Sequence, residues 1–264
     1  MKRMQENQIL PDEAVLWWLG QAGYLIRTGA VTIAIDPYLS DSAATGLPQF
    51  SRLYPPPFKA DELKADIYIV THTHADHLDP QTLQAYAHKD TTRFVAPRLA
   101  CQQLAELGIP VRNISRVDVG ESWADDTVRV SGVFALPTGV DVLDTTGYHL
   151  EFANGRTFYH TSDTQYHPLV VAAAPQQPEV MVVPINGKWN NTNAEQAADF
   201  AAQIRAVRVI PNHYDMMALN AENPEVFRWF CEQMGLKDAC MVATVLQPIR
   251  WNGNREYTER QMIK

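Results

Sequence analysis

The sequence predicts an α/β protein in which mixed β-sheets are covered on the outside by helices. Short apolar strand candidates occur in closely spaced groups, and other strand candidates alternate with helix candidates, in both halves of the chain. No repeat, heptad pattern, low-complexity segment or linker-like composition interrupts the 264 residues. We therefore predict a single domain that spans residues 1–264.

The first part of the chain predicts an antiparallel meander. Short apolar runs separated by turn residues predict three strands, at residues 14–19, 23–27 and 31–35. The segment 36–57 is rich in Ser, Pro and Gly, so we expect a surface loop that forms a candidate wall of a pocket. Residues 66–71 form a continuous apolar run, which is typical of a strand covered on both faces.

The rest of the chain predicts helices interspersed with strands. Four helices are expected, at residues 80–88, 97–107, 194–205 and 224–234. The third is the best marked, because Thr192 and Glu195 have the spacing of a capping box. Six more strands are expected, at residues 128–136, 147–152, 157–160, 180–184, 207–211 and 241–247.

The composition excludes several classes of protein. Hydrophobic residues make up 46% of the chain and charged residues 20%, which excludes disorder and fibrous structure. The net charge is −8 without a basic block, so we expect no nucleic-acid partner. The chain has neither an apolar run near the ~18 residues of a membrane span nor the apolar core of a signal peptide, so we expect no membrane association and a cytoplasmic location. Cys101, Cys231 and Cys240 lack metal-type spacing and are expected to be reduced thiols.

The strongest functional signal follows the buried strand 66–71. Residues 71–77 read Thr-His-Thr-His-Ala-Asp-His, so four residues of metal-ligand type, His72, His74, Asp76 and His77, occupy six positions. In a sequence of this composition, the pattern arises by chance roughly once in two thousand chains. Imidazole and carboxylate groups suit Zn, Mn or Fe, and the absence of thiolates argues against a structural zinc knuckle.

Two more residues of ligand type follow strand candidates. Asp163 comes just after the strand 157–160, and His213 just after the strand 207–211. If the three strand ends meet at one edge of the sheets, where α/β proteins usually build their sites, all six side chains would share one site. We predict that they do.

Four other residues are candidates for contacting a substrate. His160 and His167 flank Asp163 and could support the site, face the substrate or simply be exposed. Lys188 and Asn190 lie in the segment 186–191, between a strand and a capped helix, where Lys188 and backbone amides could meet a phosphate or carboxylate. A plain exposed loop is the alternative.

These motifs resemble those of the metallo-β-lactamase superfamily, and within it the L-ascorbate-6-phosphate lactonase group. The matching segments are residues 16–23, 71–77, 159–164 and 210–216, and the similarity runs from about residue 14 to residue 247. The resemblance implies a four-layer αββα sandwich with a metal site at one edge of its two sheets. It also implies catalysis with a divalent metal, Mn or Zn, as one or two ions.

The chain departs from the superfamily pattern at one ligand. Most members carry a histidine at the end of the strand that precedes the one at 147–152, where this chain reads Ala135 to Asp141 without one. We therefore expect weak binding at the first metal position, unless Asp141 partly replaces the histidine. The lactonase group shares this absence. Its members are longer around residues 40–64, which leaves the ascorbate-phosphate substrate open.

The predicted activity is metal-dependent hydrolysis of a small polar ester, with a lactone as the expected substrate. A bound divalent ion lowers the pKa of its water, and the resulting hydroxide would attack the carbonyl carbon. Asp76 would orient this hydroxide or carry its proton, and the metal or a neighbouring imidazole such as His77 would stabilise the oxyanion. The alternatives are a phosphodiesterase and a non-catalytic metal-binding protein of the same fold. The expected partner is a small-molecule substrate, and a homo-oligomer stays open.

Overall fold

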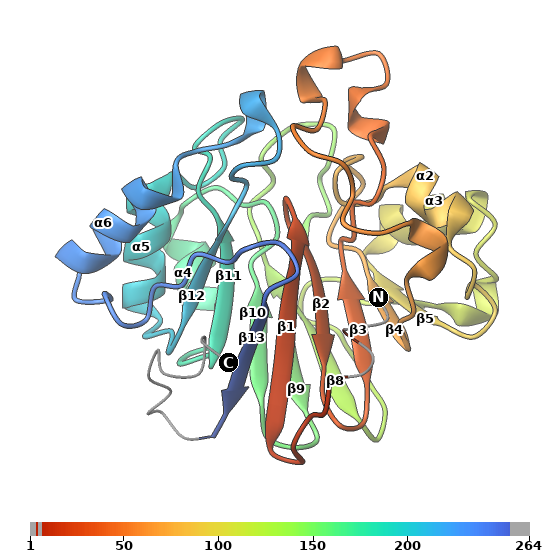
Figure 1. Ribbon diagram of the computed structural model, residues 1–264, viewed down its shortest axis with the longest axis horizontal. Coiled ribbons are helices and arrows are strands. Elements are labelled where there is room, and N and C mark those ends of the chain that lie inside the picture. Colours follow the sequence, from red (N-terminus) through yellow and green to blue (C-terminus); the bar gives the residue numbers. More distant parts are fainter. Residues whose placement is uncertain (1–3, 5–6, 254–264) are drawn as a thin grey trace.

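The computed structural model describes residue 4 and residues 7–253. In this part of the chain, thirteen strands form two mixed sheets that face each other, and helices cover both outer faces (Figure 1). The predicted α/β sandwich with αββα layering is therefore confirmed.

The first sheet joins an antiparallel meander to a parallel half. Its strand order is β13-β1-β2-β3-β4-β5-β6. Strands β13, β1, β2 and β3 pair antiparallel, whereas β3, β4, β5 and β6 run parallel. The strands are β1 (Glu13–Gly20), β2 (Gly23–Arg27), β3 (Thr32–Ile35), β4 (Ile67–Ile69), β5 (Arg93–Ala96), β6 (Ile114–Arg116) and β13 (Pro248–Asn252).

The second sheet repeats this plan. Its order is β12-β11-β10-β9-β8-β7, with antiparallel pairs from β7 to β10 and parallel pairs from β10 to β12. The strands are β7 (Ser122–Ala124), β8 (Val128–Phe134), β9 (Thr146–Phe152), β10 (Thr157–His160), β11 (Val180–Pro184) and β12 (Val209–Asn212). Each sheet therefore has a parallel half whose carboxyl ends point the same way.

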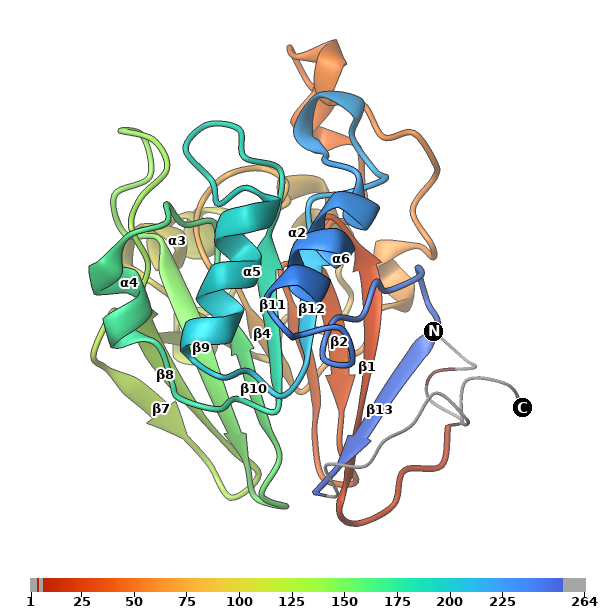
Figure 2. The ribbon, with the colours of Figure 1, turned by 90° about the vertical axis from the view of Figure 1, so that its left-hand side faces the viewer.

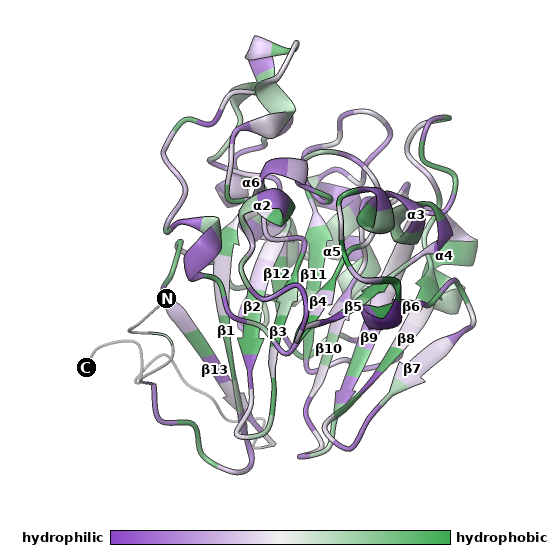
Figure 3. Cartoon of the chain, turned by 90° about the vertical axis from the view of Figure 1, so that its right-hand side faces the viewer, coloured by the Kyte–Doolittle hydropathy of each residue, from purple (hydrophilic) through white to green (hydrophobic). Residues whose placement is uncertain are grey.

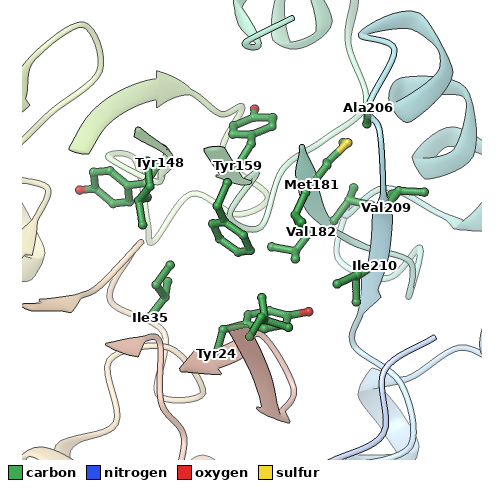
Figure 4. Packing of buried hydrophobic residues seen from close by; sticks show 14 of the residues in the cluster. Tyr24, Ile35, Tyr148, Tyr159, Met181, Val182, Ala206, Val209 and Ile210 are labelled. Atoms are coloured by element: carbon green, nitrogen blue, oxygen red, sulfur yellow. The ribbon is translucent and has the colours of Figure 1, made fainter. Parts of the chain in front are cut away.

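The alternation of side chains along the strands produces two cores. In β1, Leu16 and Trp18 belong to the cluster between the sheets, whereas Val15 and Trp17 belong to the cluster on the outer side of the first sheet. Figure 4 shows side chains of the first sheet facing those of the second across the inner core. Because β1 is buried on both faces, its sequence is a continuous apolar run.

The helices flank the two sheets. Figure 2 shows α4 (Pro168–Ala173), α5 (Ala194–Gln203) and α6 (Pro224–Gln233) beside the second sheet, and Figure 3 shows α2 (Pro80–Ala85) and α3 (Arg98–Glu106) beside the first. Hydrophobic colour in Figure 3 is prominent on the strands, whereas the helices carry both hydrophobic and hydrophilic residues. Among the described residues, no helix is long and apolar enough to cross a membrane.

Several predicted elements are corrected by the structure. Residues 241–247 do not form a strand; the chain crosses there in an irregular conformation, and β13 begins only at Pro248, where it pairs with β1. The cap of α5 is Asn193, whose side chain accepts from the amide of Gln196, and Gln196 completes the box. Thr192, the predicted cap, instead donates its hydroxyl to the carbonyl of Pro184.

Four short elements were not predicted. They are β5, β6, β7 and α4, none longer than six residues. The segment 36–57 is irregular, as expected, apart from the 3-10 turns η1 (Ser42–Ala44) and η2 (Pro48–Phe50). Two more of these turns, η3 (Ala60–Glu62) and η4 (Val111–Asn113), lie in the first sheet's connections, and η5 (Ala218–Asn220) follows β12.

Candidate metal centre

The site lies where the parallel halves of the two sheets end. The turn 71–77 follows β4, residues 161–163 follow β10, and His213 follows β12. Parallel strands deliver their carboxyl ends to the same edge of a sheet, and the two sheets present these edges at the upper end of the molecule in Figure 1. Three segments that are distant in the sequence are thereby brought together.

The six predicted ligands form two adjoining clusters. His72, His74 and Asp163 make the first cluster, and Asp76, His77 and His213 make the second; in each, one ligand atom per residue lies within 4.8 Å of the others. Asp163 joins the two, because its Oδ1 lies 3.4 Å from Nε2 of His77 and 3.3 Å from Nε2 of His213. The clusters therefore share a carboxylate.

The imidazole atoms that face the centre fit a metal ion. Nε2 of His77 and Nε2 of His213 are buried, and neither makes a hydrogen bond within the described chain. A buried polar atom without a partner is costly, and a metal ion would supply the missing interaction. Nitrogen and carboxylate oxygen donors without sulfur are the ligands of Zn, Mn and Fe sites. The residues present therefore fit a divalent cation.

Asp36 orients the turn that carries the ligands. Its Oδ2 lies 2.7 Å from Nδ1 of His77, and its two oxygens accept hydrogen bonds from the amide and the hydroxyl of Thr71, at 2.9 and 2.6 Å. All three groups are buried. The bond at Nδ1 turns the opposite nitrogen of His77 toward the second cluster, an arrangement that fixes both the tautomer and the ring orientation of a metal-binding histidine.

The electrostatics of the centre favour a cation. Burial alone lowers the pKa of His77, but Asp163, Asp76 and Asp36 outweigh burial and raise this pKa to about 10. Burial lowers the pKa of His72 and of His213, so both rings are neutral and have a lone pair to offer. Burial works against the charged form of Asp163, yet the facing histidines and Asn191 lower its pKa overall. The metal-free centre thus combines two neutral imidazoles, His72 and His213, with an ionised Asp163 and a protonated His77, whose proton a bound cation would replace.

Two amide side chains hold the carboxylates of the clusters. Nε2 of Gln21 donates to Oδ2 of Asp76 at 2.9 Å, and Nδ2 of Asn191 donates to Oδ2 of Asp163 at 2.9 Å. The second bond leaves Oδ1 of Asp163 directed at the histidines of the second cluster. In this way each carboxylate has a defined orientation before any ion is bound.

Backbone strain concentrates around the site. Seven of the ten non-glycine residues with a left-handed φ in the described chain lie in its loops. These seven are Gln21, Asp36, Ser162, Trp189, Asn190, His213 and Asp215. Such conformations cost about 1–3 kcal/mol each and persist where the surrounding structure enforces them, as at binding and catalytic sites.

Asp141 does not join either cluster. Nδ1 of His74 faces Nε2 of His72 at 3.0 Å, and Oδ2 of Asp141 lies 3.2 Å from Nε2 of His74, on the other side of the ring. The aspartate is exposed and is placed to orient His74 from outside. It therefore occupies a supporting position, and within residues 7–253 the first cluster has no substitute for the missing histidine.

The four candidate substrate-binding residues already have protein partners. The ring of His160 is buried and bonds the carbonyl of Ala22 through Nε2 and the amide of Ser162 through Nδ1. His167 is exposed and caps α4. Lys188 donates to the carbonyls of Leu219 and Ala221, and Asn190 donates to the carbonyl of Thr138. These contacts organise the loops around the site.

Some residues that organise the site were not singled out in the sequence. They are Gln21, Asp36, Thr71 and Asn191. Asp36 carried a usable signal, because it follows the strand candidate 31–35 directly, just as the ligands follow theirs. Gln21 and Asn191 lie in ordinary polar turns, so only the folded chain shows which carboxylates they contact.

Comparison with known proteins assigns the family. Two relatives named UPF0173 metal-dependent hydrolases, from Hyperthermus butylicus and Archaeoglobus fulgidus, are 27% and 28% identical to this chain. These alignments cover 88% of this chain and 95% of the first relative, and 83% of this chain and 91% of the second.

Solved structures agree with the fold. An isothiocyanate hydrolase from Delia radicum gut bacteria aligns with a TM-score of 0.75 at 16% identity, over 90% of this chain and all of that one. A metallo hydrolase from Ignicoccus hospitalis aligns with a TM-score of 0.72 at 20% identity, over 92% of this chain and all of that one. The family model described as the beta-lactamase superfamily domain matches residues 32–214, and the chain therefore belongs to the metallo-β-lactamase superfamily.

Proposed function

We propose that the protein is a metal-dependent hydrolase that cleaves a carboxylic ester, with a lactone as its substrate. One observation carries the proposal: buried imidazole nitrogens without hydrogen-bond partners converge with two carboxylates in adjoining clusters. The names of the relatives as metal-dependent hydrolases support the reaction class. The resemblance to the L-ascorbate-6-phosphate lactonase group supports the ester bond.

The two clusters would hold the divalent cation unequally. His77, His213 and Asp76, together with Oδ1 of Asp163, offer four donors to the second cluster, whereas the first has His72, His74 and a share of Asp163. We expect Mn or Zn to bind first at the second cluster. A bound divalent cation supplies a Lewis acid for the carbonyl and lowers the pKa of water toward neutrality.

The side chains around the centre have separate tasks. Asp76 is partly exposed, and Gln21 holds its carboxylate, so it is placed to orient an attacking water and accept its proton. Asp36 fixes Nδ1 of His77, so Nε2 of this ring faces both carboxylates and is placed to hold the cation at which negative charge on the carbonyl oxygen would be stabilised. Asn191 keeps Asp163 directed at His77 and His213.

Metal analysis combined with a substrate screen tests this function. Purified protein would be loaded with Mn or Zn, analysed for metal content, and assayed against lactones, linear esters and phosphodiesters. Hydrolysis of lactones that is lost with a chelator and restored by the metal supports the proposal. Preferential cleavage of phosphodiesters would replace it with the phosphodiesterase alternative, and metal binding without turnover of any class would indicate a non-catalytic protein.

A further inference from the structure

A partly exposed aromatic pair joins two loops at the same end of the sandwich as the site. The ring of Trp189, in the loop after β11, contacts the ring of Phe50 in η2, with centroids 5.5 Å apart. Trp189 remains 49% exposed although it is large and apolar. The two loops are far apart in the sequence and both stand at the end of the sandwich that carries the clusters (Figures 1 and 2).

The loop that carries Trp189 is tied to the metal centre. Asn191, two residues later, donates to Asp163, and Asn190 donates to the carbonyl of Thr138 in the neighbouring loop. Trp189 and Asn190 both have left-handed φ values, 49° and 66°. The fold therefore holds a strained backbone that leaves a tryptophan ring exposed beside its candidate catalytic groups.

The cationic side chains of the surrounding loops are turned toward the protein. In the segments 36–57, 138–143, 186–191 and 213–221, Lys188 and Arg52 are the only lysine or arginine residues. Lys188 donates to two backbone carbonyls, with which an anionic group of a substrate would have to compete. Arg52 donates to the carbonyls of Tyr38 and Tyr54 and lies over both of their rings. Its Nη2 has no partner among the described residues, but this atom is buried and therefore closed to a substrate.

The same segments expose apolar side chains instead. Leu47, Val140, Leu143 and Leu219 are 50%, 92%, 69% and 39% exposed, and each lies in one of the four segments. η2 and η5 pack together, which brings the loop of Phe50 against the loop that follows His213. The loops at this end of the sandwich thus expose apolar side chains and no unengaged lysine.

We propose that the substrate carries an aliphatic or aromatic group that binds against Trp189 and Phe50 while its ester bond reaches the metal centre. This inference rests on the proposed hydrolase function and replaces the small polar ester expected from the sequence with an ester that has an apolar body. Contact with Trp189 makes affinity depend on the length of that body, by about two- to four-fold for each methylene group that becomes buried.

A chain-length series provides the test. We would measure kcat/KM of the metal-loaded protein for γ-lactones with unbranched alkyl substituents of increasing length. The variants are Trp189→Ala, Trp189→Phe and, as a matched control, Trp229→Ala, because Trp229 is a similarly exposed tryptophan on α6. We expect kcat/KM to rise with chain length in the wild type and in Trp229→Ala. The rise should be mostly kept in Trp189→Phe and lost in Trp189→Ala.

A binding experiment separates this inference from the proposed function. Alkyl-substituted lactams of the same lengths, which resist hydrolysis, would be titrated into the metal-loaded protein by calorimetry. Affinity that rises with chain length and loses this dependence in Trp189→Ala supports the apolar contact even if no ester is cleaved. If esters are cleaved with no dependence on chain length, or if phosphate-bearing lactones are preferred, the inference is wrong while the hydrolase function stands.

Sedimentation of the same proteins tests whether a second copy of the chain, rather than a substrate, covers Trp189 and Phe50. If the wild type is a dimer that Trp189→Ala converts to a monomer, and the dependence on chain length is absent, the aromatic pair is an interface between two copies of the chain. That result would also overturn the inference. A monomeric wild type, or one whose oligomeric state is the same in Trp189→Ala, together with a dependence on chain length that is lost in this variant, supports it.

Discussion

Single side chains around the centre differ in the groups that they contact, and these contacts allow their roles to be tested separately. Asp76 and Asp163 are both carboxylates of the clusters, yet Asp76 belongs to the second cluster alone and Asp163 lies between the two. The side chain of Gln21 donates a hydrogen bond to Asp76, and the side chain of Asn191 donates one to Asp163. Chemistry and orientation are therefore carried by different residues.

Replacement of Asp76 tests its proposed role as a base. Asp76→Asn removes the proton acceptor and a metal ligand while keeping the shape of the side chain, so we expect a kcat lower by roughly 10²- to 10⁴-fold with the fold retained. Excess metal should not restore it. The control is Asp215→Asn, because Asp215 is an exposed aspartate of the neighbouring loop outside both clusters. Circular dichroism, metal content and turnover are measured together; wild-type turnover of Asp76→Asn would contradict the mechanism.

Replacement of Asn191 tests how Asp163 is positioned. Asn191→Ala removes the hydrogen bond that directs the carboxylate, so we expect metal affinity to fall about 10- to 100-fold. Asn190→Gly is the matched control. Asn190 lies in the same loop as Asn191 but donates to the carbonyl of Thr138, and glycine accepts the left-handed φ of this position. Calorimetric titration with Mn or Zn gives both affinities. An unchanged affinity in Asn191→Ala would mean that Asp163 is oriented by other contacts.

At the scale of secondary structure, helix termini and loops hold the edges of the site. α5 begins directly after the loop that carries Asn191, so its start position determines where that loop can lie. The segment 36–57 is held by side chains rather than by regular structure: the hydroxyls of Ser40 and Ser42 donate to Asp79 at the start of α2. Such contacts join distant segments, and for this reason local sequence patterns do not reveal them.

The cap of α5 has a measurable effect on stability. Asn193→Ala removes the acceptor for the amide of Gln196, so we expect the free energy of unfolding to fall by about 0.5–2 kcal/mol. The control is Glu195→Gln, because the sequence pattern had assigned Glu195 to the capping box and glutamine keeps its size. We expect this variant to lower the free energy of unfolding by less than about 0.5 kcal/mol. Urea unfolding of the metal-free proteins measures both changes. A larger loss in Glu195→Gln would restore the original capping prediction.

At the scale of the whole molecule, both clusters form only where the two sheets meet. Each cluster takes two residues from the β4 turn and one from the second sheet, which is Asp163 after β10 for the first cluster and His213 after β12 for the second. Oδ1 of Asp163 also faces His77 and His213. The second cluster therefore has a fourth donor that the first lacks.

This asymmetry predicts the stoichiometry of bound metal. After extensive dialysis we expect about one equivalent to remain, and a second equivalent to bind only in excess metal. His213→Ala should reduce the retained metal to well below one equivalent, whereas His74→Ala should leave it near one. Metal analysis by plasma emission provides the count. Two equivalents that survive dialysis of the wild type would show that the first cluster is complete despite its missing histidine.

Local patterns were sufficient for part of the fold. The strands 14–19, 23–27, 157–160 and 180–184 were predicted almost to the residue, because each is a short apolar run bounded by turn residues. Residues 241–247 were wrongly predicted as a strand, since their apolar composition reflects packing against the inner core without a partner strand. The strands β5, β6 and β7 have three or four residues each, too few to show a period.

The sequence by itself determined the kind of chemistry, because the spacing of the residues in 71–77 and the strand ends before Asp163 and His213 are local properties. Only the tertiary structure decided which donors share a cluster, which nitrogen of His74 faces Asp141, and which polar residues are already engaged. Lys188 illustrates the difference: its sequence context left both an anion site and a plain exposed loop open, and the fold brings the carbonyls of Leu219 and Ala221 to its ammonium group. Such pairings depend on how distant loops meet, and this is decided when the two sheets pack together.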